Sequence, residues 1–251
     1  DVINSAGYQI MLGNLNYSIE DETKTIASLM SWSPAAILVA GTEHTNASFK
    51  LLSNAQCPVI EIMDLTESPI DICVGFSHRD AGREMGEYLL DRGYKRIAFV
   101  GNQLEKDKRA MKRYEGLVQA IDTSKSMDVD EALLLSVPDK DGPKTGCKIL
   151  ETIIQDHPDI DCLYFSNDDL AVGAILHAKQ LGITVPERIA IAGFNGLEIG
   201  QICSPRLTST LSPRKAVGQR AAQIALSCIN DSRPEPSVFN LGCELLTGES
   251  A

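Results

Sequence analysis

The stretch YFSNDDLAVGA, residues 164–174, decides the fold that we predict for this chain. It begins with aromatic and apolar residues, as a buried strand does, and it continues into a helix-period segment that stops at Gly182. An amide and two carboxylates stand between these parts. Such strand-to-helix turns bind ligands in open α/β sheets, so the polar residues could contact a small molecule. They could equally cap the helix, because Asn and Asp accept hydrogen bonds from its first N–H groups.

Apolar runs of strand length recur along the rest of the chain. They cover residues 8–14, 35–41, 58–64, 96–102, 162–167 and 188–195. Most of them do not alternate with polar residues, which is typical of strands buried on both faces of a parallel sheet. Helix-period segments lie between the runs; residues 80–93, for example, place Met85, Tyr88 and Leu89 on one stripe. This alternation predicts an α/β fold with right-handed crossovers.

Composition limits the classes of protein to consider. The chain has 251 residues, 43% of them hydrophobic, which is enough for one large core or two ordinary ones. A net charge of −11 would repel a phosphate backbone, so these residues alone are a poor candidate for nucleic-acid binding. Seven scattered cysteines without a C-x-x-C pair favour reduced thiols and a cytoplasmic protein. The sequence has neither a membrane-length apolar run nor a signal-peptide pattern.

Motifs for catalysis and for metal binding are missing from the sequence. We find no phosphate-binding loop, no dinucleotide-binding glycine pattern and no nucleophile elbow. The four histidines lack metal-ligand spacing, so we expect neither a metal nor a cofactor. HRD at residues 78–80 lacks the Leu and Asn of a kinase catalytic loop, and we interpret it as chance. We therefore expect a protein that is not an enzyme.

Polar residues do collect where predicted strands end. They include Tyr17, His44, Asp64, Arg109, Arg113, Asn167 and Asn195. Arg109 and Arg113 are four residues apart and therefore lie on one face of a helix. Asp, Asn and Arg side chains suit sugar hydroxyls, because each can make paired hydrogen bonds. Any one of these residues is more often a cap or a solvated side chain, but their shared position favours a binding site.

Residues 165–213 carry a resemblance to a known family. An Asn-Asp turn and a helix are followed there by ITVP, GFN and PRLT, and this pattern resembles the effector-binding core of LacI/GalR-type transcriptional repressors. Residues 74–102 and 112–121 look like the preceding blocks of that family, so the resemblance extends over essentially all of the chain. EHT at 43–45, EIMD at 61–64, GFNGLEIGQ at 193–201 and SPR at 212–214 are similar to its gluconate and idonate repressor branch.

The resemblance implies two Rossmann-like lobes of the periplasmic-binding-protein-like type I, joined by three crossovers, with the effector held between them. Residues 1–77 and 209–229 would form the N-terminal lobe, and residues 78–207 and 230–251 the C-terminal lobe. It also implies a homodimer that binds operator DNA through an N-terminal helix-turn-helix. Neither this headpiece nor the family's first core strand is among the 251 residues, so we expect the chain to begin inside a domain.

The resemblance also implies a ligand. Carried over by position, the family's ligand-contacting residues are Asp64, Arg113, Asn167 and Asn195. Many sugar-binding members have Asp where this chain has Asn195, and some have an aromatic residue where it has Arg214. An amide does not repel a carboxylate, and an arginine can hold one through two parallel hydrogen bonds. The expected effector is therefore a sugar acid such as gluconate, with 6-phosphogluconate as its rival.

In this interpretation, Asn167 contacts the ligand, while Asp168 and Asp169 cap the helix that follows. Arg113 and Arg214 hold the carboxylate, and His44 and Arg109 assist in binding hydroxyls. Two alternatives remain. A periplasmic sugar-binding protein would share the architecture, although seven cysteines argue against it. An enzyme acting on a sugar acid would need an acid–base pair, and the sequence does not identify one.

Overall fold

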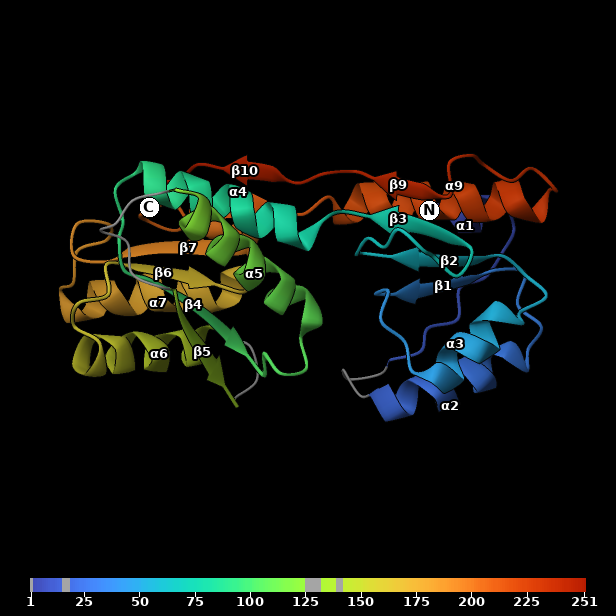
Figure 1. The fold of residues 1–251 in the computed structure, drawn as a ribbon, viewed down its shortest axis with the longest axis horizontal. Helices are drawn as coiled ribbons and strands as arrows, with labels where there is room; N and C mark the ends of the chain where they lie inside the picture. Colours follow the sequence, from blue (N-terminus) through green and yellow to red (C-terminus); the bar gives the residue numbers. More distant parts are fainter. Residues whose placement is uncertain (1, 15–18, 125–131, 139–141) are drawn as a thin grey trace. The chain divides into compact units, whose positions relative to one another are not determined.

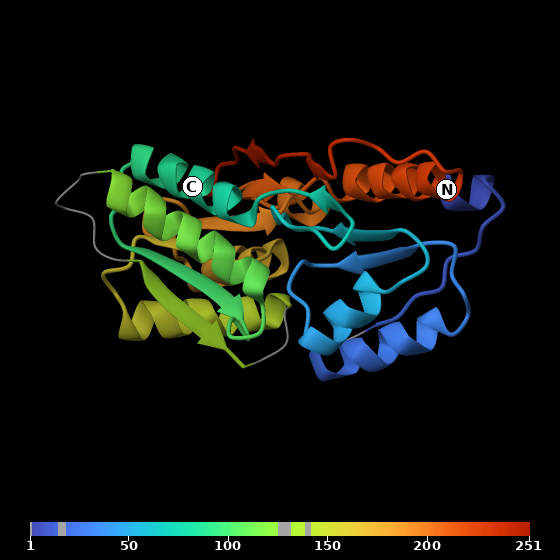
Figure 2. The same cartoon turned by 45° about the vertical axis from the view of Figure 1, so that its right-hand side comes forward.

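The computed structural model describes residues 2–14, 19–124, 132–138 and 142–251. Within it the chain forms two compact units, each with its own sheet and helices (Figure 1 and Figure 2). Unit 1 comprises Asp1–Ser77 and Pro213–Gly242, and unit 2 comprises His78–Ser212 and Cys243–Ala251. The chain therefore passes from one unit to the other after Ser77, after Ser212 and after Gly242.

Unit 1 has a parallel sheet with helices on both faces (Figure 1). Its strands follow the order β1 (Ile37–Ala40), β2 (Val59–Ile62), β3 (Ile72–Gly75) and β9 (Val238–Asn240). Its helices are α1 (Val2–Ser5), α2 (Ile19–Met30), α3 (Asn46–Ser53) and α9 (Arg214–Ile229). Helices α2 and α3 lie on one face, and α9 lies on the other with α1 beside it. Buried aliphatic side chains from α2, α3, β1 and β2 form the core between the first face and its helices.

Unit 2 has a mixed sheet, in which only β10 runs antiparallel to its neighbour among the described residues. The strand order is β10 (Glu244–Leu246), β8 (Thr208–Leu211), β7 (Ala190–Asn195), β6 (Cys162–Phe165), β4 (Ile97–Asn102) and β5 (Leu133–Val137). The helices are α4 (His78–Asp91), α5 (Lys108–Thr123), α6 (Pro143–Asp156), α7 (Asp168–Leu181) and the short α8 (Glu198–Ile202). Helices α4 and α5 cover one face, and α6 and α7 cover the other.

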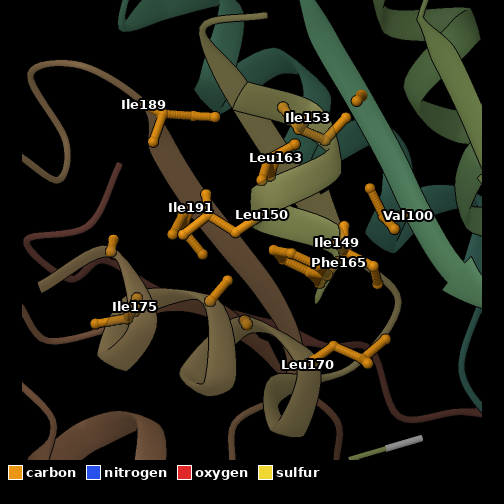
Figure 3. Packing of buried hydrophobic residues seen from close by; sticks show 14 of the residues in the cluster. Val100, Ile149, Leu150, Ile153, Leu163, Phe165, Leu170, Ile175, Ile189 and Ile191 are labelled. Carbon is orange, nitrogen blue, oxygen red and sulfur yellow. The ribbon is translucent and has the colours of Figure 1, made fainter. Parts of the chain in front are cut away.

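The core under α6 and α7 is mainly aliphatic, with Phe165 as its aromatic member. Figure 3 shows Leu150 and Ile153 of α6 and Ile175 of α7 packed against Leu163 and Ile191 of the sheet. These side chains are almost fully buried, and each aliphatic side chain removed from water contributes about 1.5–3 kcal/mol. Helix α7 ends at Gly182, which has φ = 70° and forms the expected left-handed cap.

Five of the predicted strands are confirmed, but the run at residues 8–14 is not a strand. The predicted runs at 35–41, 58–64, 96–102, 162–167 and 188–195 contain β1, β2, β4, β6 and β7. Residues 8–14 form no strand, and Ile10, Met11 and Leu12 are exposed to solvent. An apolar run forms a strand only where a neighbour accepts and donates its backbone hydrogen bonds, and these residues pair with none in the described part of the chain.

The boundaries between the units differ from the expected ones at two places. We expected residues 230–251 in the second lobe, but β9 pairs in parallel with β3, so backbone hydrogen bonds hold residues 230–242 in unit 1. We also expected the first lobe to resume at residue 209, whereas β8 pairs with β7 and belongs to unit 2. The last segment of the chain thus supplies one strand to each sheet, since β10 pairs with β8.

Helices α4 and α5 approach each other closely because glycines stand at their contact. A β-carbon on Gly82 would overlap the backbone of Arg113, and one on Gly116 would overlap the carbonyl oxygen of Arg79. Only hydrogen atoms fit at these positions, so α5 is held against α4 at the level of Arg113. This contact fixes the depth of that side chain in unit 2.

We expect Gly116→Ala to lower the free energy of unfolding by about 1–3 kcal/mol, because the added methyl group must push two packed backbones apart. Gly218→Ala is the matched control, since Gly218 is an exposed residue inside α9 with open space at its β-carbon. That change should stabilise the protein by about 0.5–1 kcal/mol through helix propensity. Urea unfolding of both variants measures the difference, and equal stabilities would contradict the close helix contact.

Candidate functional site

Arg113 of α5 is a buried cation of unit 2, only 4% exposed. Its Nη1 lies 2.9 Å from Nδ1 of His78, and its Nη2 donates to the backbone carbonyl of Ser166 at 3.0 Å. Its guanidinium carbon lies 3.9 Å from the centroid of the Phe194 ring. Residues from α4, from the end of β6 and from β7 therefore converge on one guanidinium group.

The partners of Arg113 leave its positive charge unbalanced. Burial lowers its pKa, and the nearby charge of Arg109 acts in the same direction. Among the described residues, no carboxylate lies within ion-pair distance of Arg113, and its Nε atom has no hydrogen-bond partner. A buried charge is costly unless it is paired, so this group favours an anionic ligand.

His78 and Phe194 contact Arg113 in the candidate site, and the sequence did not identify them. A guanidinium has only donors, so Nδ1 of His78 must accept its hydrogen bond and carries no proton. The His78 and Phe194 rings are 5.7 Å apart and enclose the guanidinium with Ser166. The place of His78, at the first turn after β3, was the available signal.

Asn195 lies at the end of β7, next to the Phe194 ring that contacts Arg113. Its backbone has φ = 116°, a conformation that residues with a side chain rarely adopt. Its Oδ1 accepts a hydrogen bond from Ser212 Oγ at 3.4 Å. Strained backbone at a strand end is a feature of binding sites, because the surrounding structure must hold it there.

The N-cap of α7 is Asn167 and not Asp168 or Asp169, which lie in the first turn of the helix. Asn167 is the N-cap of α7, and its Oδ1 accepts from the backbone N–H of Leu170 at 3.0 Å. The cap uses the amide oxygen alone, so the NH₂ group is still able to donate to a ligand. Asp168 does not cap the helix as expected: its Oδ2 accepts from the backbone N–H of Leu197 and its Oδ1 from Ser209 Oγ, both at 2.6 Å.

The structure thus brings three predicted site residues of unit 2 to one edge of its sheet. Arg113 is bound to the carbonyl of Ser166, which directly precedes Asn167, and it lies over the ring that directly precedes Asn195. Strands β6 and β7 are parallel neighbours in the sheet, so the asparagines at their carboxyl ends lie at the same edge. Arg109 is half-buried one turn before Arg113 on α5. The edge therefore offers two cations and two amides.

Predicted site residues of unit 1 lie at the ends of β1 and β2 and at the start of α9. Asp64 is buried, and its Oδ1 accepts from the N–H of Leu65 at 2.8 Å, while its Oδ2 lies 3.5 Å from Thr42 Oγ1. Arg214 begins α9 and is exposed. Tyr17 lies outside the described residues, so its predicted role stays a prediction.

His44 has a different setting from the one we expected. Its side chain is 2% exposed; its Nδ1 lies 2.8 Å from Glu22 Oε1, and its Nε2 lies 3.5 Å from Glu61 Oε1. Burial lowers the pKa of His44, but the two carboxylates outweigh burial and raise it to about 9. A protonated His44 thus joins α2 to β2. Because both ring nitrogens face carboxylates, this geometry favours a structural role over contact with a hydroxyl group.

Comparison with known proteins gives one consistent picture. Residues 87–251 match the family model described as a periplasmic binding protein-like domain. The HTH-type transcriptional regulator GntR of Pseudomonas aeruginosa is 34% identical over 249 residues, which cover 99% of this chain and 71% of that protein. The HTH-type transcriptional regulator IdnR of Escherichia coli is 30% identical over 252 residues, which cover 99% and 74%.

Solved structures extend the comparison to the fold. A LacI family transcriptional regulator from Silicibacter pomeroyi superposes with a TM-score of 0.92 at 32% identity, covering 99% of this chain and 74% of that one. In the described part of the chain, no helix has the length and apolarity needed to cross a membrane.

The buried His44 cluster predicts a pH-dependent stability. In the folded protein the pKa of His44 rises from its ordinary value of 6.5 to about 9, so its charge stabilises the fold fully below pH 6.5. This contribution is lost as the pH rises through about 9. We expect the free energy of unfolding of the native protein to fall over that interval, as measured by chemical denaturation.

The His44→Gln variant is the control for this prediction. It should be less stable at pH 6.5, because Glu22 and Glu61 stay buried without their counter-charge, and it should lack the alkaline loss. Burial raises the pKa of the Cys57 thiol above its ordinary value, and this group is common to both proteins, so its contribution cancels in the difference. Parallel pH profiles would show that His44 is not charged in the folded state.

Proposed function

Because the chain belongs to the LacI family of transcriptional regulators, in the branch that holds GntR and IdnR, we propose that it is the effector-binding core of a cytoplasmic regulator that senses a sugar acid such as gluconate. The observation that carries this proposal is the buried Arg113 cation, which lacks a carboxylate ion-pair partner among the described residues. The carboxylate of a sugar acid would supply the missing negative charge.

The chemistry of the neighbouring residues supports the same ligand. Arg113 binds the carboxylate, and the half-buried Arg109 adds a second positive charge one helical turn away. Asn167 and Asn195 bind hydroxyl groups, since each amide can both donate and accept. An aspartate in place of Asn195 would repel a carboxylated ligand. The effector contacts predicted for Asp64, Arg214 and Tyr17 stay predictions.

Regulation requires that the effector distinguish two states of the protein. A ligand shifts such an equilibrium only by the difference between its affinities for the two states, typically about 1–3 kcal/mol. Operator DNA is contacted by a helix-turn-helix outside these 251 residues, which agrees with their net charge of −11. The effector-binding core then acts on the operator through its conformational equilibrium.

An apolar surface of unit 2 supports the proposal of a homodimer. Helix α8 packs against α7, and the two helices expose Leu176, Ile199 and Ile202, the last of which is 73% exposed. Large apolar side chains gathered on neighbouring exposed helices are typical of protein interfaces. We propose that two copies of the chain associate through this α7–α8 surface, as a two-fold operator requires.

Calorimetric titration tests the proposed effector. D-gluconate should bind and D-glucose should not, because only the acid supplies an anion for Arg113. Arg113→Met should weaken gluconate binding more than tenfold, about 1.4 kcal/mol or more. Arg79→Met, which removes an exposed arginine of α4, is the matched control and should bind as the unaltered protein does.

The outcomes separate the possible errors. A preference for 6-phosphogluconate would mean that the protein is a regulator with a different effector. Equal binding of gluconate by a folded Arg113→Met variant would contradict the role of Arg113. If the folded protein binds neither acid, the sugar-acid proposal is wrong.

Sedimentation velocity tests the proposed dimer. Ile202→Ser should shift the protein towards monomer, because it removes an exposed apolar side chain from the α7–α8 surface. Leu134→Ser, at a partly exposed apolar residue of β5, is the matched control and should leave the association unchanged. A monomeric native protein, or an unchanged Ile202→Ser dimer, would exclude this surface.

A further inference from the structure

The backbone of Asn195 needs support from elsewhere in unit 2. Its φ of 116° is followed by a φ of 65° at Gly196, so the chain turns sharply straight after β7. Glycine tolerates such angles, but an asparagine pays a conformational cost of about 1–3 kcal/mol for a sparsely populated backbone region. Without a restraint, residue 195 would relax and its side chain would change direction.

One buried carboxylate holds the two residues that follow Asn195. Asp168 Oδ2 accepts from the backbone N–H of Leu197 at 2.6 Å, and Asp168 Oδ1 accepts from Ser209 Oγ at 2.6 Å. Ser209 Oγ in turn accepts from the backbone N–H of Gly196 at 3.3 Å. Consecutive backbone donors after Asn195 are thus tied to Asp168, one directly and one through a hydroxyl group.

Packing leaves the Asp168 carboxylate little freedom to move. Asp168 is 0% exposed, and a β-carbon on Gly193 of β7 would overlap its Oδ1. On the other side of the turn, a β-carbon on Gly196 would lie only 2.6 Å from the Leu211 side chain. Strand β7, strand β8 and the start of α7 therefore enclose the carboxylate and the turn together.

The position of Asp168 in α7 also favours its ionised form. It lies in the first helical turn, where the free N–H groups and the helix dipole stabilise a negative charge. Hydrogen bonds to an ionised carboxylate are shorter and stronger than those between neutral groups, which agrees with the two distances of 2.6 Å. A neutral amide at this position could not replace them, because it has only one acceptor oxygen.

We propose that Asp168, acting through Leu197 and Ser209, is a positioning residue that fixes Asn195 in its strained conformation and thereby sets the affinity for the effector. Because Asp168 is fully buried, it acts through Asn195 and not by contact with the ligand. The effector part of this inference rests on the proposed function, whereas the anchoring of the turn does not.

Amide hydrogen exchange of the ligand-free protein tests the anchoring by itself. In Asp168→Asn, the N–H groups of Gly196 and Leu197 should exchange at least tenfold faster, because Oδ1 and Oδ2 no longer both accept. The N–H of Leu170, which Asn167 caps, should keep its rate. Asp169→Asn is the matched control, since it removes the same charge from the same helix turn at an exposed residue. Unchanged exchange at Gly196 and Leu197 would overturn the proposal.

A double-mutant cycle tests the coupling to the effector. Asp168→Asn should weaken gluconate binding at least tenfold in the native background, and Asp169→Asn should weaken it less than twofold. In an Asn195→Gly background, where the strain and the amide are both gone, Asp168→Asn should cost less than twofold. A loss of affinity that is equally large in both backgrounds would mean that Asp168 acts on the unit as a whole, which contradicts a positioning role.

Two further results distinguish a failure of the anchoring by Asp168 from a failure of the proposed effector. If the native protein binds no sugar acid but Asp168→Asn still speeds exchange at Gly196 and Leu197, the effector proposal fails and the anchoring stands. If Asp168→Asn does not fold, Ser209→Ala replaces it. That variant should speed exchange at Gly196 and leave Leu197 unchanged, and equal rates at Gly196 would overturn the proposed contact.

Discussion

The charge of Arg113 is the constraint on which unit 2 depends. Removing a charge from water costs several kcal/mol, so a buried cation is tolerated only when the surrounding elements supply partners for it. Helix α4 contributes His78 as an acceptor, β6 contributes a carbonyl, and β7 contributes an aromatic face. The glycine contact between α4 and α5 brings the backbone of Arg113 close enough for these groups to reach it. The packing of α4 against α5 thus also determines the surroundings of Arg113, the residue that we propose binds the effector.

A second feature of unit 2 is that a polar strand, β8, lies inside it. Thr208, Ser209 and Thr210 are buried, which would be unfavourable if their hydroxyl groups had no partners. Thr208 Oγ1 donates to the carbonyl of Ala251, and Ser209 Oγ donates to Asp168. The strand is therefore a source of hydrogen bonds for its surroundings, and the turn at Asn195 uses one of them. In this part of unit 2, the buried hydroxyl groups hold the turn at the proposed ligand residue Asn195.

Much of the fold could be predicted because long apolar runs bury themselves in parallel sheets. Strand β8 could not, since its TSTL sequence has no apolar pattern, and residues 8–14 misled us because an apolar run does not show whether a partner strand exists. The residues of the candidate site also differ in whether the sequence could predict them. Arg113 and Asn195 were visible from their places after strands. The roles of His78 and Asp168 depend on partners 35 and 41 residues away, which spacing does not reveal.

The pairing of residues 244–251 has a consequence for how the chain is made. Strand β10 completes the sheet of unit 2, and Ser250 bonds Thr208 and Ile191 in its interior. Because synthesis runs from the N-terminus, residues 78–212 of unit 2 leave the ribosome before residues 244–251 do. The contacts span up to 163 residues, between Tyr88 and Ala251. Such long-range closure slows folding, and the β8 edge of the nascent sheet stays unpaired until residues 244–246 have been synthesised.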